Sequence, residues 1–247
     1  MAGTVIAVAS GKGGAGKSSL CVLLGDALCR LGRSAVLLDL DFGIRALDLF
    51  LGADSGPYHL LDILAKRCRP ADALIPLNDS GRFCLCQAPP SQDDQTVIPW
   101  ELLAPLTDLL AEHFDFVIAD CPAGVTPALY AASRVCDRAL VITNPEPVAV
   151  RSAALCGSLI AAQNPGAVRQ LVINRVMPRF RDNILTDFDD IMDTVGLPLA
   201  GVIPFDPALS RAAAAGKLAS FSREPLTEAV RRTALRLTGK RVPLAIA

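Results

Sequence analysis

The chain has 247 residues, with 24 Lys and Arg against 25 Asp and Glu and a formal net charge of −1. This balance gives no reason to expect a surface that coats nucleic acid, so a nucleic-acid partner is not expected. The length suits one large α/β domain over residues 1–247, although length alone does not exclude two domains.

Eight cysteines are spread along the chain without a Cys-x-x-Cys pair or a neighbouring histidine. We therefore predict reduced, mostly buried thiols in a cytoplasmic protein, rather than a zinc site or a disulfide framework. We expect no targeting segment, since residues 1–3 show neither a basic nor an apolar leader pattern. The longest uncharged run, Ser152 to Val168, is interrupted by Asn164-Pro165-Gly166 and is short for a bilayer, so we expect no membrane span.

The stretch Val5–Ser19, VIAVASGKGGAGKSS, is typical of a buried strand that runs into a glycine-rich turn and a helix. Gly11, Gly16, Lys17 and Ser18 satisfy the P-loop pattern G-x-x-x-x-G-K-[ST]. The glycines let backbone amides approach a phosphate, and the helix N-terminus attracts it. Lys17 adds a positive charge, and the Ser18 hydroxyl is placed to bind magnesium. Glycine-rich turns also join strands to helices without any ligand, but the full pattern directly after a strand favours nucleotide binding. The residues expected to hold the nucleotide here are Gly11, Lys12, Gly13, Gly14, Ala15, Gly16, Lys17, Ser18 and Ser19.

Strands and helices then alternate along the chain. The stretch Lys17–Arg30 has apolar residues at helical spacing and is followed by Gly32. Further strands are expected at Ala35–Leu40, Phe83–Gln87, Phe116–Asp120, Ala139–Thr143, Leu171–Asn174 and Ala200–Ile203. Further helices are expected at Tyr58–Lys66, from Trp100 onward, at Asp182–Asp193 and at Leu226–Thr238. This order predicts a doubly wound α/β fold with a mostly parallel sheet, in which ligands bind at the carboxyl ends of the strands.

Polar residues follow several of the expected strands. Asp39 and Asp41 close the second strand two positions apart, so both face one side if the chain is still extended. One of them could then support a magnesium shell and the other orient an attacking water, with turn chemistry as the alternative. Asp120 follows four apolar residues in the manner of a Walker B strand, or it caps a helix. Asn174 offers a donor and an acceptor to a purine edge, with capping again as the alternative.

The segment Lys12-Gly13-Gly14-Ala15-Gly16-Lys17-Ser18 resembles the deviant Walker A motif of the MinD/ParA family of ATPases, which are P-loop NTPases of the SIMIBI type. The stretch Asp39–Leu49 is similar to the family's switch I, and Asp120-Cys121-Pro122-Ala123-Gly124 to its D-x-P-A-G switch II. The resemblance implies that Lys12 reaches the partner's phosphates in a nucleotide-sandwich dimer. Without a partner, Lys12 is equally well explained as a solvated loop lysine.

The same resemblance assigns roles to the remaining polar residues. Asp41 would position the attacking water, and Ser18, Asp39 and Asp120 would hold magnesium. The Gly124 amide would contact the γ-phosphate. The segments Asn174-Arg175 and Pro204-Phe205-Asp206 resemble those that flank the base, which assigns Asn174, Arg175, Pro204 and Asp206 to the adenine site.

Similarity to the MinD-type members of this family covers most of the chain. It implies a magnesium-dependent ATPase that dimerises on ATP binding, acts in septum placement with MinC- and MinE-like regulators, and attaches peripherally to an anionic membrane. The C-terminus departs from the pattern, because Pro243 follows the last expected helix and no amphipathic helix with aromatic anchors is present. The basic residues there either face lipid or form a solvated helix face: Arg231, Arg232, Arg236, Lys240 and Arg241.

Three other functions remain open at this point. A ParA-like partitioning ATPase shares the P-loop and would need a basic surface for DNA. An iron–sulfur or electron-transfer ATPase would need cysteines that can bridge a dimer, for which Cys121 in switch II is the hint. A regulatory scaffold would bind ATP without appreciable turnover.

Overall fold

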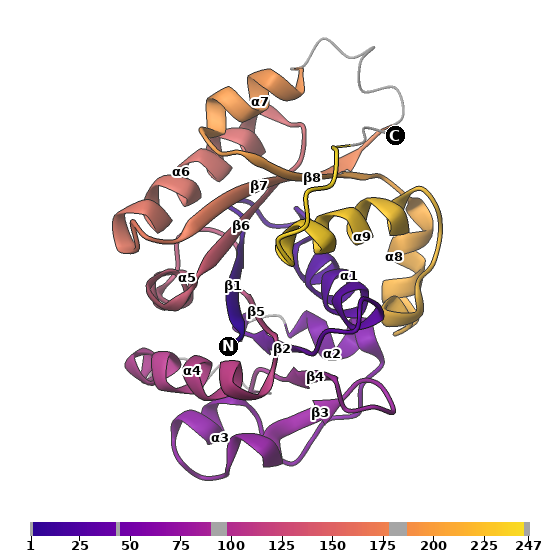
Figure 1. Cartoon of the computed structure of the whole chain (residues 1–247). Helices are drawn as coiled ribbons and strands as arrows, with labels where there is room; N and C mark the ends of the chain where they lie inside the picture. Colours follow the sequence, from indigo (N-terminus) through magenta and orange to yellow (C-terminus); the bar gives the residue numbers. More distant parts are fainter. Residues whose placement is uncertain (1, 43–44, 90–97, 178–186, 245–247) are drawn as a thin grey trace.

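The computed structural model describes residues 2–42, 45–89, 98–177 and 187–244 (Figure 1). Within these residues an eight-stranded sheet has the order β3-β4-β2-β5-β1-β6-β7-β8. The neighbouring strands are parallel except for β3 and β4, which pair antiparallel at one edge. The strands are β1 Thr4–Ala9, β2 Ala35–Asp39, β3 Leu74–Pro76, β4 Phe83–Cys86, β5 Phe116–Asp120, β6 Arg138–Thr143, β7 Val168–Val176 and β8 Leu199–Pro204.

Helices cover both faces of this sheet (Figure 1). On one face lie α3 Leu60–Leu64, α4 Leu103–His113, α5 Pro127–Val135, α6 Pro147–Gln163 and α7 Phe188–Val195. On the other lie α1 Lys17–Arg30, α2 Ala46–Leu51, α8 Pro207–Ala214 and α9 Leu226–Leu237. Short 3-10 helices span Pro70–Ala73, Trp100–Leu102 and Leu218–Ser220. No helix of the described residues is long and apolar enough to cross a bilayer.

The central strands are apolar on both sides because each side meets a helical layer. In β1, Val5, Ala7 and Ala9 enter the core on the α4–α6 side, whereas Ile6 and Val8 enter the core on the α1 side. Burial on both faces is the reason that parallel strands read as continuous apolar runs rather than alternating ones. This pattern made the strands visible in the sequence, and the predicted fold class is confirmed.

The predicted strands are all present, most with ends within one or two residues. Strand β7 is longer than predicted and starts at Val168, and β3 was not predicted. Three residues at an antiparallel edge are too few to show a periodic pattern. The helix expected at Asp182–Asp193 starts at Phe188, and positions 182–186 lie outside the described residues. The eight cysteines, all within the described residues, are free, and most of them are buried.

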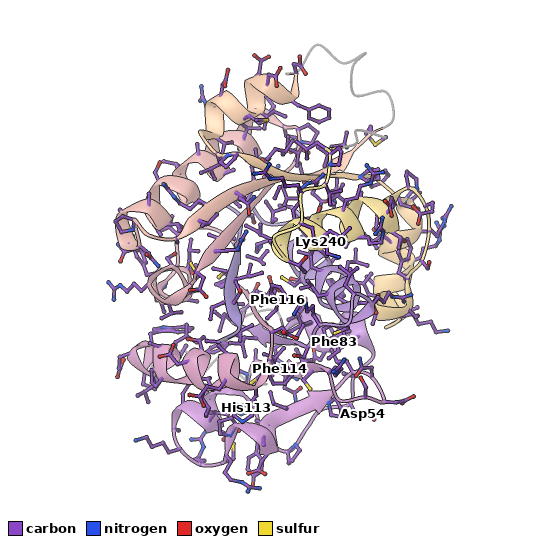
Figure 2. All side chains as sticks on the ribbon, viewed as in Figure 1. Asp54, Phe83, His113, Phe114, Phe116 and Lys240 are labelled. Carbon is purple, nitrogen blue, oxygen red and sulfur yellow. The ribbon has the colours of Figure 1, made fainter. Side chains whose placement is uncertain are left out.

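Gly25 allows α1 to lie close to the sheet. A Cβ at this position would collide with the buried ring of Phe83, coming within 2.7 Å of its Cζ (Figure 2 labels Phe83). Another helical glycine, Gly157 in α6, has more room, because its Cβ would come no closer than 3.2 Å to the flexible end of Leu197. The two glycines therefore differ in packing although both lie inside helices.

We expect Gly25→Ala to lower the free energy of unfolding by about 1–3 kcal/mol, because overpacking at Phe83 outweighs the gain in helix propensity. Gly157→Ala is the matched control and should change it by less than about 1 kcal/mol, since the same propensity gain offsets a mild contact. Urea unfolding followed by circular dichroism measures both. Equal effects of the two substitutions would contradict the packing argument.

Candidate nucleotide site

The turn between β1 and α1 has the geometry that phosphate binding requires. Gly14 and Gly16 have φ angles of 77° and 89°, which residues with a Cβ rarely adopt. Gly16 is the N-cap of α1 and offers no side chain to the first turn, so the amides there are available to an anion. A Cβ on Gly13 or Gly14 would meet nothing within 4 Å. The loop is therefore open around these two glycines.

Residues from α6 and β7 pack closely against two other glycines of the loop. A Cβ on Gly11 would collide with Ser152 of α6, and a Cβ on Gly16 would collide with the amide nitrogen of Asn174. The Asn174 Nδ2 donates to the Ala15 carbonyl at 2.8 Å, and its Oδ1 accepts from the Arg175 amide at 2.9 Å. Asn174 therefore holds the loop in place, but it does not end its strand as predicted, because β7 continues to Val176.

Two buried carboxylates lie side by side behind the loop. The parallel register of β2 and β5 makes Asp39 and Asp120 direct neighbours, and each is only 1% exposed. Burial raises the pKa of Asp120 to about 6, against the opposing effects of a hydrogen bond from Ser18 and the charge of Lys17. Burial, and then the charge of Asp120, raise the pKa of Asp39 well above its usual value. Two neighbouring buried carboxyl groups do not ionise easily. A bound cation would stabilise their ionised forms.

The donor set fits magnesium. The Oδ1 atom of Asp120 is buried and has no hydrogen-bond partner, and the Ser18 hydroxyl lies within hydrogen-bonding distance of the same carboxyl group. No cluster of three or more His, Cys, Asp or Glu among the described residues could enclose a metal ion. This suits Mg²⁺, which commonly binds through one or two protein carboxylates and takes its remaining ligands from phosphate and water.

Asp41 lies just beyond the end of β2. The strand stops at Asp39, so the regular strand on which a shared face of Asp39 and Asp41 depended does not extend to Asp41. The Asp41 amide instead donates to Asp39 Oδ1 at 3.0 Å, which is the turn chemistry that formed the alternative. The half-buried Asp41 carboxylate is nevertheless close enough for its charge to raise the pKa of both Asp39 and Asp120. It also lines a second cavity of about 270 Å³, together with Phe42 and Trp100.

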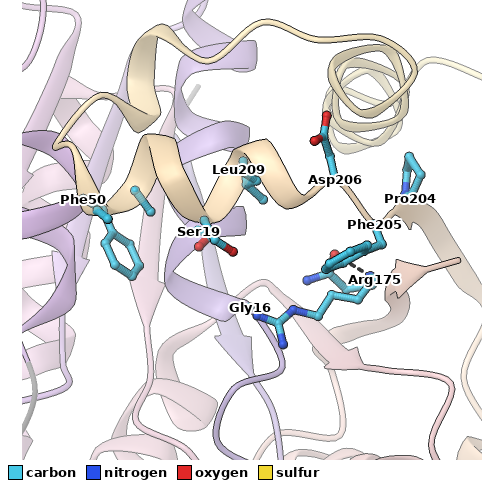
Figure 3. A pocket seen from close by; sticks show the side chains of 12 residues that line it. Gly16, Ser19, Phe50, Arg175, Pro204, Phe205, Asp206 and Leu209 are labelled. Carbon is cyan, nitrogen blue, oxygen red and sulfur yellow. Dashed lines mark hydrogen bonds between the residues drawn. The ribbon is translucent and has the colours of Figure 1, made fainter.

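The expected base-binding residues meet at one pocket of about 260 Å³ (Figure 3). Asn174, Arg175, Pro204 and Asp206 line it with Gly16 and Ser19 from the loop and α1. The prediction did not include the other lining residues, which are Phe50, Phe205, Leu209, Ser210, Ala213 and Ala214. The small residues of α8 recur at helical spacing and could have been inferred, whereas nothing local in the sequence marks Phe50.

Two of the base-site residues have structural roles as well. The Asp206 carboxylate caps α8 by accepting from the Ala208 amide at 2.8 Å, and it pairs with Arg223 at 3.3 Å. Arg175 has a φ of 59°, unusual for a residue with a side chain, at the end of the regular pairing between β7 and β8. Such backbone conformations persist only where the surroundings enforce them.

The two loop lysines lie in different environments. Lys17 is 7% exposed at the start of α1. The Lys12 side chain is 46% exposed, and its Nζ forms an ion pair of 2.8 Å with Glu146 Oε2, whose side chain is 56% exposed. Lys12 is therefore held at the rim of the loop, and only Lys17 is buried at the phosphate position.

Switch II is bonded to the loop in this structure. The Gly124 amide, expected to contact the γ-phosphate, donates to the Ser10 carbonyl at 2.9 Å. A contact with phosphate would replace this hydrogen bond. Gly124 also has a φ of 82°, so the turn depends on glycine.

The C-terminal arginines and Cys121 do not form the surfaces that other functions need. Arg231 and Arg232 both pair with Glu228, at 2.6 and 2.8 Å. Arg236 donates to the carbonyls of Ala200, Val242 and Pro243. Most of the basic cluster is thus engaged within the chain. Cys121 is fully buried, so it cannot reach a second copy to bridge an iron–sulfur cluster.

Comparisons with known proteins agree with this geometry. The sequence model of the CobQ/CobB/MinD/ParA nucleotide binding domain matches residues 6–219. The septum site-determining protein MinD of Bacillus subtilis is 32% identical over 247 residues, covering 99% of this chain and 92% of the relative. MinD in the MinC:MinD complex of Aquifex aeolicus superposes with a TM-score of 0.87 at 28% identity, covering 98% of each chain. MinD of Pyrococcus horikoshii, solved with Mg-ADP, gives 0.83 at 25% identity, covering 95% of each. The chain therefore belongs to the CobQ/CobB/MinD/ParA nucleotide-binding family and, within it, to the MinD septum site-determining ATPases.

Proposed function

We propose that the chain hydrolyses ATP with magnesium as a nucleotide-sandwich dimer and, through that cycle, places the division septum. The observation that carries the proposal is the meeting of three elements at the carboxyl ends of the central strands. These are the uncapped start of α1, the buried pair Asp39 and Asp120, and the pocket beside Asn174. The Mg-ADP bound to the related P. horikoshii MinD supports the choice of ligand.

Each residue then has a role that its position supports. Lys17 and the loop amides hold the phosphate chain, and Ser18 with Asp39 and Asp120 holds the metal, directly or through water. Magnesium bound there neutralises charge on the phosphate oxygens. Asp41, half-buried beside the pair, orients the attacking water. Catalysis is by positioning and charge stabilisation, without a covalent intermediate.

Lys12 acts on the second copy in this proposal. Its ion pair with Glu146 keeps it at the rim, away from the position that Lys17 occupies in its own loop. In the ATP-bound dimer Lys12 exchanges Glu146 for the partner's phosphates and stabilises charge at the β–γ bridge. Hydrolysis is then slow in the monomer.

Regulators and a membrane complete the proposed cycle. The MinC:MinD complex of A. aeolicus supports a MinC-like partner, and family membership supports a MinE-like activator and peripheral attachment to the inner face of the membrane from the cytoplasm. The engaged arginines of α9 supply little free charge for lipid. A ParA-like role on DNA would need the same free charge, so what favours the septum role is the similarity to MinD proteins.

The first test is phosphate release with ATP, measured together with molar mass by light scattering, with and without vesicles of anionic lipid. We expect Lys12→Ala to abolish ATP-driven dimerisation and to lower turnover by at least about a hundredfold, because a charge supplied in trans is removed. Nucleotide affinity should largely remain, since Lys17 is intact. Lys217→Ala, which removes an exposed lysine elsewhere, is the control.

Full activity in Lys12→Ala would remove the sandwich-dimer argument. Absence of turnover in the wild-type protein, with ATP bound, would instead favour a regulatory scaffold. Failure of the ATP-loaded protein to sediment with the vesicles would exclude direct attachment to lipid.

Asp41→Ala should separate dimerisation from chemistry. We expect the variant to dimerise with ATP as the wild type does, because the phosphate contacts remain, and to hydrolyse ATP about a hundredfold more slowly. Single-turnover phosphate release and molar mass measure the two properties. Asp54→Ala, at an exposed carboxylate, is the control. Unimpaired turnover would refute the role of Asp41.

The raised pKa of Asp120 predicts a pH-dependent stability. An unfolded carboxyl titrates near pH 4, but in the folded chain burial raises the pKa of Asp120 to about 6. Its contribution to the free energy of unfolding therefore becomes less favourable as pH rises from about 4 to about 6, and stays so above. We expect Asp120→Asn, without nucleotide, to be more stable than wild type at pH 7 by up to about 3 kcal/mol.

That difference should disappear as the pH falls toward 4, where both side chains are neutral. The stabilisation that Mg-ADP gives to the wild type should also be reduced in the variant, because a metal-binding group is lost. Urea unfolding at pH 7 and near pH 4, with and without Mg-ADP, measures these differences. A variant that is less stable than wild type at pH 7 would contradict the electrostatic argument.

A further inference from the structure

Phe50 brings the switch I segment into the base pocket. It lies in α2, the short helix that follows Asp41, and lines the pocket with residues of α1, β7 and α8. In the view of Figure 3, Phe50 lies at the opposite end of the pocket from Phe205, with α8 between them. The side chain is half-buried and packs on the α1-side core. No motif in the sequence includes it.

A contact between two glycines fixes α2 against α8. Gly52 ends α2 with a φ of 59°, and Gly216 follows α8 with a φ of 66°. A Cβ on Gly52 would lie 2.7 Å from the Gly216 carbonyl oxygen, and a Cβ on Gly216 would lie 2.8 Å from the Gly52 Cα. The two backbones touch with no room for side chains. This contact joins the helix of Phe50 to the helix of Leu209 and Ala213, which line the same pocket.

The other end of α2 is tied to Asp41. The Arg45 amide, at the N-cap, donates to the Asp41 carbonyl at 3.1 Å. The Arg45 guanidinium donates to Asp48 Oδ2 at 2.6 Å and to Gln87 Oε1 at 3.1 Å, which anchors the same end beside β4. A six-residue helix thus connects Asp41 to the base pocket.

We propose that Phe50 is a nucleoside-positioning residue and that, through α2, it makes the placement of switch I depend on a nucleoside in the pocket. The inference rests on the proposed function, because it takes the occupant to be the nucleoside of ADP or ATP. We expect a phosphate chain alone to occupy the loop at Gly13–Ser18, whereas Phe50 lines the base pocket. ADP and inorganic pyrophosphate must therefore differ in their effect on switch I.

Binding of Mg-ADP and Mg-pyrophosphate to Phe50 variants, measured by calorimetry, tests the contact. We expect Phe50→Ala to lower the affinity for ADP by about tenfold, because one apolar wall of the pocket is lost. The affinity for pyrophosphate should change by less than about twofold. Phe50→Leu, which restores an apolar wall, should recover most of the ADP affinity. An unchanged ratio of ADP to pyrophosphate affinity in Phe50→Ala would overturn the proposal.

Gly216→Ala tests the link to α8 against a matched control. Gly196 also follows a helix, with a φ of 69°, but a Cβ there would meet nothing within 4 Å. Gly196→Ala and Gly216→Ala therefore share the backbone strain and differ in the contact with Gly52. We expect only Gly216→Ala to lower the ratio of ADP affinity to pyrophosphate affinity, by about tenfold. Equal weakening by both substitutions would overturn the role of the glycine contact.

Trp100 fluorescence reports on switch I. It would not depend on the ligand through Phe50 if the role of Phe50 were purely structural. It is the only tryptophan of the chain, and its ring stacks on Phe42, next to Asp41, with centroids 5.6 Å apart. At saturating ligand, ADP should change Trp100 emission more than pyrophosphate does in wild type. In Phe50→Ala the ADP signal should fall to the pyrophosphate level. Equal signals from ADP and pyrophosphate in wild type would overturn the coupling, whereas wild type that binds neither ligand would refute the proposed function itself.

Discussion

The parallel register of three central strands is the constraint on which the site depends. Strand β2 pairs with β5, and β5 pairs with β1. The carboxyl ends of these parallel strands therefore bring together Asp39, Asp120 and the start of the P-loop. The same register forces two carboxylates into a buried position, where burial raises the pKa of both and nearby carboxylates add to it, Asp120 acting on Asp39 and Asp41 on both. A bound cation would favour the ionised carboxylates, so the feature that disfavours the folded chain on its own would stabilise it with the cation bound.

The Lys12–Glu146 pair suits a residue that must change partners. Both side chains are about half exposed, and ion pairs in such positions contribute only about 0–1 kcal/mol. The pair is therefore strong enough to bias Lys12 toward the rim and weak enough to be replaced by a phosphate, whose bonds to a cation are charge-assisted. The Gly124 amide is also able to change partners. Its hydrogen bond to the Ser10 carbonyl is an ordinary one between neutral groups, which a charged acceptor can replace.

The parts of the molecule that the sequence predicted are those determined locally. The strands are apolar runs, and the P-loop needs glycines at fixed spacing, so both are visible without a structure. The missing parts depend on contacts between distant residues. Glu146 lies 134 positions from Lys12, and Phe50 lines the base pocket on a helix whose C-terminal Gly52 lies against the distant Gly216. The turn at Asp41 was visible as an alternative, but only the end of β2 at Asp39 decides in its favour.

Residues 40–42 line one cavity and Phe50 lines another, and the two groups are close in the sequence. Leu40, Asp41 and Phe42 line one cavity, with Pro122 and Thr126 of the switch II side opposite them. Phe50 lines the other, against α8. Packed interiors transmit displacement because they contain little free volume. Under the proposed coupling, a ligand that fixes Phe50 would restrict Asp41 through α2 and the hydrogen bond from the Arg45 amide to the Asp41 carbonyl. The two proposals together make recognition of the nucleoside and placement of the Asp41 carboxylate a single population shift.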